Sequence, residues 1–322
     1  MSAEVTILGA GVAGLCVAHE LADRGAAVRI LDPAGGPGPE CCSWWAGGML
    51  APFCEGEAAE EPVTRLGAQA ADWWQAAGVP VARDGTLVVA LGRDRGELDR
   101  FARRTEGHRR LDGEQLAALE PVLSGRVSGG LHFAQESHID PRTALGTLRQ
   151  GLAARGVCVA ANGDLNGTVI DCRGLAARDR LPQLRGVRGE MAVLRAPEVT
   201  LRRTMRMLHP RHPLYLVPRG DGVYMLGATQ VESDGRGPPT LRSVAELLNA
   251  AYALHPAFAE AEVLEIGADA RPAFPDNLPR IVPQGDRIHV NGLFRHGFLL
   301  APAMARMVAG LVLDGEHSEF LQ

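Results

Sequence analysis

Three glycines near the N-terminus have the spacing of a phosphate-binding turn. Gly9, Gly11 and Gly14 form a G-x-G-x-x-G pattern, and Asp32 follows Gly14 by 18 residues. The first glycine permits a tight turn, the second lets the backbone approach a pyrophosphate, and the third lets a helix pack close to a strand. A carboxylate at that distance accepts hydrogen bonds from ribose hydroxyls. The pattern predicts a dinucleotide site in which Asp32 disfavours NADP, while NAD and FAD both remain open.

Cationic side chains stand near the other end of the chain, beside its most apolar segment. Arg295 and His296 come directly before an apolar run that begins at Gly297, and Arg271 lies in "ARPAFPD", which we expect to form an ordered turn. A charge at such a place is costly to bury unless it has a partner. We therefore expect an anion to meet these guanidinium groups.

The elements that position these residues follow from hydrophobic periodicity. Val5–Leu8 and 27–31 read as buried strands, and a helix between them would end at Gly25. Together they predict a strand–turn–helix–strand unit, which 168–174 would join as a further parallel strand. At the far end, Ile288–Asn291 predicts a strand, and the segment from Gly297 predicts a long helix with Pro302 in an early turn. Its N-terminus would place a second helix dipole near the same sheet edge.

The middle of the chain predicts a second, mostly antiparallel sheet. Residues 214–218 and 223–227 flank the turn "RGDG" and read as a hairpin, with further strands at 86–91, 129–134 and 189–196. The expected helices lie at 61–77, 94–104, 141–155 and 240–254. These segments alternate along the chain, which predicts discontinuous domains. We place one domain at 1–80, 140–185 and 275–322, and a substrate-binding domain at 81–139 and 186–274.

Composition excludes several classes of protein. Lys plus Arg number 33 and Asp plus Glu number 38 in 322 residues, a net charge of −5 that argues against nucleic-acid and anionic-membrane binding. The six cysteines show no C-x-x-C pair or zinc-finger spacing, so we expect reduced thiols and no metal site. His209 and His212 read as ordinary loop residues. No leader and no uncharged membrane-length apolar run is present, so we expect a soluble cytoplasmic protein.

Five segments of the sequence resemble the D-amino-acid oxidase superfamily of FAD enzymes, and most closely its glycine oxidases of thiamine biosynthesis. They are "GAGVAG" with Asp32, "SWWAGGMLAP" (43–52), "VIDCRG", "YLVPRGDGVYMLGAT", and "RPAFPDNLP" followed by "GLFRHGFLLAP". The resemblance covers nearly the whole chain and implies an α/β fold, with a Rossmann-like FAD-binding domain and an antiparallel substrate domain. It also implies noncovalent FAD, because no cysteine is placed for a flavin link.

The resemblance implies which residues hold the cofactor. The segment 43–49 would wrap the flavin with small residues and backbone N–H groups, and the backbone from His296 would lie at the pyrimidine edge of the ring. We interpret Trp44 and Trp45 as core packing and His296 as a structural hydrogen-bonding residue. The implied FAD-binding residues are Gly9, Gly11, Val12, Ala13, Gly14, Asp32, Ser43, Ala46, Gly47, Gly48, Met49, Gly174, Arg295, His296, Gly297, Phe298 and Leu299.

The resemblance also implies a clamp for a substrate carboxylate. Arg271 would form a bidentate pair with it, Tyr215 would donate a hydrogen bond, and Arg295 would find in it the carboxylate partner that it needs. Met49 would form a pocket wall and Gln230 the pocket mouth, where relatives often carry an apolar residue.

The implied reaction is oxidation of glycine by FAD and O₂ to the imine and hydrogen peroxide, with glyoxylate and ammonia as hydrolysis products. Thiazole synthase is an implied partner, and relatives often self-associate, which implies a homo-oligomer. The alternatives are a D-amino-acid or sarcosine oxidase or dehydrogenase and, more distantly, a non-catalytic dinucleotide-binding protein.

Two features depart from the family pattern. Asp32 replaces the glutamate common in relatives, one methylene shorter but able to accept the same hydrogen bonds. The segment before residue 168 is short, so we expect that part of the sheet to be trimmed and assign no adenine contact there.

Overall fold

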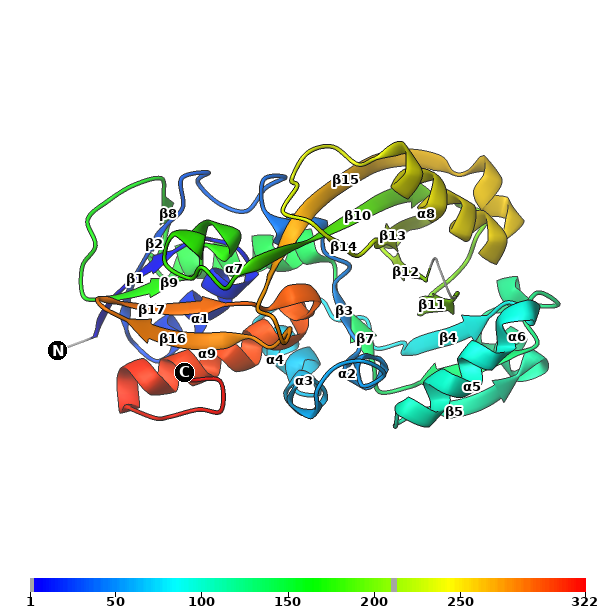
Figure 1. Cartoon of the computed structure of the whole chain (residues 1–322), viewed down its shortest axis with the longest axis horizontal. Helices are drawn as coiled ribbons and strands as arrows, with labels where there is room; N and C mark the ends of the chain where they lie inside the picture. Colours follow the sequence, from blue (N-terminus) through cyan, green and yellow to red (C-terminus); the bar gives the residue numbers. More distant parts are fainter. Residues whose placement is uncertain (1–2, 210–212) are drawn as a thin grey trace.

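The structure is a computed structural model that describes residues 3–209 and 213–322; His212 lies outside the described residues. Two large sheets lie side by side along the long axis of the molecule, and both chain ends lie at the end that holds the first sheet (Figure 1). The first sheet has six strands and the second has nine. The chain passes back and forth between them, as the alternation of segments predicts.

The first sheet is built around the strand–turn–helix–strand unit at the N-terminus. Its strands in spatial order are β16 (Arg280–Gln284), β17 (Arg287–Asn291), β9 (Thr168–Asp171), β1 (Glu4–Leu8), β2 (Ala27–Leu31) and β8 (Val159–Ala160). All pairings are parallel except that between β16 and β17. The prediction that 168–174 adds a parallel strand is confirmed. The strand in the short segment before it, β8, has two residues.

Helices α1 (Val12–Asp23), α7 (Pro141–Ala154) and α9 (Gly297–Asp314) form the core with this sheet, and α1 packs against both α7 and α9. Helix α9 is apolar on nearly all sides. The segment Phe294–Asp314 is long and apolar enough to cross a membrane by length and composition, but 67% of its most apolar window is buried inside the structure. An all-round apolar helix in that position is a core helix.

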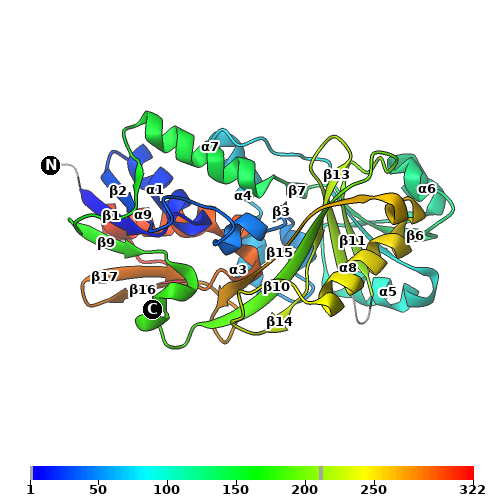
Figure 2. The same cartoon turned by 90° about the horizontal axis from the view of Figure 1, so that it is seen from above.

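The second sheet is mostly antiparallel, as predicted. Its strands are, in spatial order, β14 (Val231–Glu232), β10 (Arg185–Arg195), β13 (Val223–Gly227), β12 (Leu214–Pro218), β11 (Thr204–Leu208), β4 (Thr86–Ala90), β6 (Gly129–Phe133) and β5 (Arg109–Asp112), with β15 (Glu262–Ala273) paired to the free side of β10. Only β11 and β4 pair in parallel. Helix α8 (Leu241–Leu254) packs on β10, and the long strands β10 and β15 reach toward the first sheet (Figures 1 and 2).

Smaller elements complete the two layers. Helices α5 (Arg95–Arg104) and α6 (Gly113–Leu119) lie beside β5 and β6, and β3 (Met49–Leu50) pairs with β7 (Ser137–His138) between the two sheets. The strands of the first sheet fall within 1–80, 140–185 and 275–322. The strands of the second sheet fall within 81–139 and 186–274, except for the first residue of β10. The division into domains at those boundaries stays a prediction.

Several elements differ from the sequence-based expectation. The helix expected at 61–77 is two helices, α3 (Glu61–Gly67) and α4 (Ala70–Ala76), and Gly67 packs so tightly that an added Cβ would lie 2.7 Å from the Leu299 side chain. Strand β15 was not expected, and it carries Arg271, for which we expected a turn. Its first five residues include no buried side chain, so the strand shows no alternation of apolar and polar positions.

Candidate functional site

A cavity of about 820 Å³ lies between the two sheets, among the residues that the structure describes. One end is formed by the turn after β1 and by Asp32 after β2; the other is formed by β12, β15 and the start of α9. The carboxyl ends of parallel strands are where ligands bind in sheets of this kind. The cavity is large enough for a dinucleotide and a small substrate together.

The nucleotide end is built by backbone that only glycine can form. Gly9 has φ +96°, and an added Cβ would lie 2.7 Å from the carbonyl oxygen of Cys172; a Cβ on Gly14 would lie 1.9 Å from the Gly9 oxygen. Gly14 therefore allows α1 to start directly behind β1. The Asp32 carboxylate accepts hydrogen bonds from the backbone N–H groups of Ala10 at 2.7 Å and Ala34 at 2.9 Å. These bonds fix its orientation and leave lone pairs for ribose hydroxyls.

Two helix N-termini without side-chain caps face this cavity. Helix α1 follows Gly11 and α9 follows His296, and neither residue caps its helix through a side-chain hydrogen bond. Residues of the first turn of both helices line the cavity. Uncapped N–H groups and the helix dipole favour negative charge at such positions. The cavity therefore offers two positions that favour negative charge, one at each helix start.

The segment from Ser43 to Met49 forms the long wall between these ends. It runs through the short helix η1 (Cys42–Trp45) to Gly48, which has φ +72° and whose added Cβ would lie 2.2 Å from the Ile139 carbonyl oxygen. Ser43 is buried and accepts a hydrogen bond from the Val12 N–H at 3.1 Å. This segment presents backbone and small side chains to the cavity over most of its length.

The interpretation of the two tryptophans as core residues is wrong. Both are half-buried, and Trp45 lines the cavity and packs on Gly267, where an added Cβ would lie 2.0 Å from its ring. Trp44 lies under the Arg142 guanidinium at 4.5 Å from its ring centre. Strand β15 explains why Trp45 is not a core residue, since the Trp45 ring packs on Gly267 of this strand, outside the hydrophobic core.

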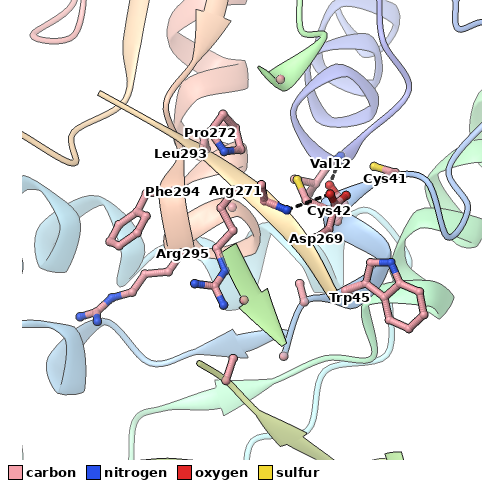
Figure 3. A pocket seen from close by; sticks show the side chains of 18 of the residues that line it. Val12, Cys41, Cys42, Trp45, Asp269, Arg271, Pro272, Leu293, Phe294 and Arg295 are labelled. Carbon is pink, nitrogen blue, oxygen red and sulfur yellow. Dashed lines mark hydrogen bonds between the residues drawn. The ribbon is translucent and has the colours of Figure 1, made fainter. Parts of the chain in front are cut away.

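At the substrate end, Arg271 projects into the cavity from β15 (Figure 3). It donates one long hydrogen bond, 3.4 Å, to the Thr229 carbonyl, and no carboxylate among the described residues lies within ion-pairing distance. Tyr215 on β12 lies against the same space, with its ring between Gly47 and Gly227. Burial raises the pKa of the Tyr215 phenol, so it stays a hydrogen-bond donor at neutral pH. The two groups place a guanidinium and a hydroxyl donor at the same end of the cavity, an arrangement with the chemistry to bind a carboxylate, and that role stays a prediction.

Arg295 does not need a substrate carboxylate, contrary to the expectation from sequence. Its guanidinium forms an ion pair of 2.6 Å with Glu55, at the end of the short helix α2 (Pro52–Glu55), and points away from Arg271 (Figure 3). His296 bonds the same Glu55 oxygen at 2.9 Å, and Arg206 lies 3.6 Å from the carboxylate. Burial alone would raise the pKa of Glu55, but Arg295 and His296 outweigh it and hold this pKa well below its usual range. Glu55 is therefore the anion that pairs with Arg295.

Glu55 and Arg206 are site residues that the sequence analysis missed. Glu55 ends the segment "MLAPFCE", which holds no other carboxylate, but Glu57, Glu60 and Glu61 follow closely, so the sequence contains only a weak signal for it. Arg206 lies on β11, a strand that was not expected, so no pattern marked its side chain. The interpretation of His296 as a hydrogen-bonding residue agrees with its contact to Glu55.

The structure brings nearly all the sequence-predicted residues to this cavity. Gly14 is the exception, because it does not line the cavity but lies behind the turn, where it packs against Gly9. Gln230 is exposed at the cavity mouth. Their roles in binding cofactor and substrate stay predictions. The predicted residues that line the cavity are Gly9, Gly11, Val12, Ala13, Asp32, Ser43, Ala46, Gly47, Gly48, Met49, Gly174, Tyr215, Gln230, Arg271, Arg295, His296, Gly297, Phe298 and Leu299.

The chain is similar to known proteins both in sequence and in structure. The profile of the FAD-dependent oxidoreductase family (DAO) matches residues 4–311. A Rhizobium etli protein with a provisional assignment as the thiamine biosynthesis oxidoreductase ThiO is 57% identical over 317 residues, 96% of each chain. The bifunctional protein ThiO/ThiG of Synechocystis is 27% identical over 99% of this chain and 53% of its own. Glycine oxidase from Geobacillus kaustophilus has a TM-score of 0.83 at 21% identity, covering 99% of this chain and 97% of that one.

Proposed function

The chain belongs to the family of FAD-dependent oxidoreductases, and from this premise we propose that it oxidises glycine to its imine as part of thiamine biosynthesis. One observation in the structure carries the proposal. Arg271 projects into the cavity with no carboxylate partner among the described residues, beside a protonated tyrosine. A half-buried guanidinium in that position is suited to an anionic substrate group.

The residues of the cavity fit FAD. The glycine turn and the uncapped start of α1 would hold the pyrophosphate, and Asp32 would hold the ribose. The wall from Ser43 to Met49 presents backbone and short side chains at Ala46, Gly47 and Gly48, where the flavin ring would lie. The uncapped start of α9 would stabilise negative charge at the far end of the ring system.

In this reading the substrate is held by its carboxylate. Arg271 binds both carboxylate oxygens and the Tyr215 hydroxyl donates a third hydrogen bond, which orients the α-carbon toward the cofactor wall. FAD, when bound, supplies the two-electron acceptor, and O₂ accepts these electrons to give hydrogen peroxide. The glycine imine hydrolyses to glyoxylate and ammonia. Met49 and the Tyr215 ring border this end of the cavity, which favours a substrate without a bulky side chain.

Arg295 has a different role from Arg271. Because Glu55 neutralises it, Arg295 adds no free positive charge to the carboxylate site, and its contact with His296 holds the start of α9 in place. The carboxylate clamp then consists of Arg271 and Tyr215.

We also infer a partner and a compartment. A relative that joins ThiO and ThiG in one chain supports transfer of the unstable imine to a thiazole synthase. The six cysteines are free thiols, which supports a reducing compartment such as the cytoplasm. A homo-oligomer would be consistent with the resemblance.

Anaerobic reduction of the purified holoprotein tests the proposed function. We expect glycine to bleach the flavin absorbance, and readmitted O₂ to restore it with one hydrogen peroxide per glycine. A panel of sarcosine, D-alanine and D-proline measures preference in the same assay. Faster bleaching by a D-amino acid than by glycine would assign the protein to D-amino-acid oxidation instead, and no bleaching by any of them would reject an amine oxidase.

A further inference from the structure

Arg219 is a buried cation that the carboxylate clamp does not use. It follows β12 by one residue and opens the turn between β12 and β13, and its side chain is only 11% exposed. Burial lowers the pKa of Arg219 to about 10, so it remains charged at neutral pH. A buried guanidinium lowers the stability of the fold unless its N–H groups have acceptors. The acceptors that Arg219 contacts therefore indicate its role.

The donors of Arg219 join three segments that are far apart in the sequence. One Nη donates to the Gly47 carbonyl at 2.7 Å, the other Nη donates to the Ile139 carbonyl at 2.9 Å, and Nε forms an ion pair of 3.1 Å with Asp140. Asp140 in turn caps α7 by accepting from the Thr143 N–H at 2.7 Å. The wall of the cofactor cavity, the start of α7 and the substrate-side hairpin therefore meet at one guanidinium.

Tyr215, four residues before Arg219, shares one of these partners, Gly47. An added Cβ on Gly47 would lie 2.9 Å from its ring, and one on Gly227 would lie 2.5 Å from its hydroxyl. The ring therefore has little free space on either side. Its hydroxyl position depends on where the Gly47 backbone lies, and Arg219 holds that backbone by its carbonyl.

We propose that Arg219 is a positioning residue that fixes the Tyr215 hydroxyl relative to the cofactor wall by holding the Gly47 and Ile139 carbonyls. This inference rests on the proposed function, because it assigns the carboxylate of the substrate to Tyr215. It predicts that loss of Arg219 weakens carboxylate binding more than it weakens cofactor binding, since no Arg219 donor reaches the nucleotide end.

A double-mutant cycle on the holoenzyme tests it. The variants are Arg219→Met, Tyr215→Phe and the pair, with Arg219→Lys as a second substitution that keeps the charge and one donor group. The readouts are KM and kcat for glycine, FAD content, and the affinity for acetate measured from the flavin spectrum. Acetate carries the carboxylate without the amine, so this reading needs no turnover. Arg203→Met is the matched control, because Arg203 is also largely buried, pairs with Glu120 at 3.1 Å and donates to the Leu119 carbonyl at 2.9 Å, but does not line the cavity.

We expect Arg219→Met to weaken acetate binding and raise KM by at least about fivefold with FAD retained, and Arg219→Lys to restore part of the loss. Tyr215→Phe should then cost less in the Arg219→Met background than in the wild type, because the hydroxyl is already misplaced. Arg203→Met should change both values less than about twofold, because its partners lie outside the cavity. Multiplicative effects, or unchanged acetate affinity in both Arg219 variants, would overturn the positioning role. A holoprotein that binds acetate as described but is not reduced by glycine would reject only the proposed substrate.

Discussion

At the scale of single residues, the difference between Arg271 and Arg295 decides how the site works. The two guanidinium groups line one cavity, but only Arg295 has a carboxylate partner within the described part of the chain, at 2.6 Å. Because Glu55 neutralises Arg295, that arginine is a structural cation. Arg271 has no such partner and is available to substrate. Sequence alone could not separate them, because both arginines precede a turn or helix start and both neighbour apolar residues.

The first prediction concerns Arg271. Replacing it with alanine should lower kcat/KM for glycine by more than about tenfold, or about 1.4 kcal/mol, because the substrate carboxylate loses its bidentate partner. Steady-state kinetics on the FAD-loaded variant measures this. Arg195→Ala is the control, since that arginine forms an ion pair with Glu262 and is 50% exposed. A loss smaller than tenfold in Arg271→Ala would show that the clamp lies elsewhere.

At the scale of elements, the wall segment depends on a glycine in a left-handed conformation. Gly48 has φ +72°, and its missing Cβ leaves room for the Ile139 carbonyl and the Pro141 ring. Gly48→Ala should destabilise the protein by about 1–3 kcal/mol or more, and FAD content should fall. Thermal unfolding and the flavin-to-protein absorbance ratio measure these effects. In contrast, Gly146→Ala within α7 meets open space and should gain about 0.5–1 kcal/mol.

Glu136, a carboxyl that contacts helix α2, should make the free energy of unfolding depend on pH. Glu136 is fully buried and accepts a hydrogen bond from the Cys54 N–H at 2.7 Å, and burial raises its pKa from 4.5 to about 7. A carboxyl whose pKa is higher in the folded state stabilises below its unfolded pKa and loses that contribution as pH rises. Urea unfolding should therefore show stability that decreases from about pH 4.5 to pH 7 through this group and then levels off.

A substitution separates this group from the other acids. Glu136→Gln should flatten that part of the pH profile, because glutamine does not titrate. Asp286→Asn, at an exposed turn with 74% of its side chain accessible, should leave the profile unchanged. An unaltered slope in Glu136→Gln would assign the dependence to another group.

At the scale of the whole molecule, the cofactor cavity joins the two sheets. Its walls come from β1, β2 and α1 on one side and from β12 and β15 on the other. A ligand there contacts both layers, so FAD should stabilise the entire fold. Free FAD at about 100 times its Kd should add about 2.7 kcal/mol to the unfolding free energy of the apoprotein.

Asp32 provides the variant for this prediction. Asp32→Asn keeps the size of the side chain but weakens acceptance from ribose hydroxyls, so the rise in melting temperature with FAD should be smaller. Calorimetry of the apoprotein with increasing FAD measures it. Equal FAD-dependent shifts in the variant and the wild type would remove Asp32 from the cofactor site.

The local features of this protein can be predicted from its amino-acid sequence. The glycine turn with its two strands, the hairpin at 214–227 and helices α5, α7 and α8 follow from periodicity and turn residues over short windows. The five segments also identified the family. These features are local, because each depends on contacts between residues that are near in the chain.

Which charged groups pair with one another became clear from the packed fold alone. Glu55 and His296 are 241 positions apart, and Gly47 and Arg219 are 172 apart. The ion pair that neutralises Arg295 and the contact that holds the cofactor wall depend on how the two sheets pack against each other. That packing depends on the whole core at once, so no short window of sequence contains it.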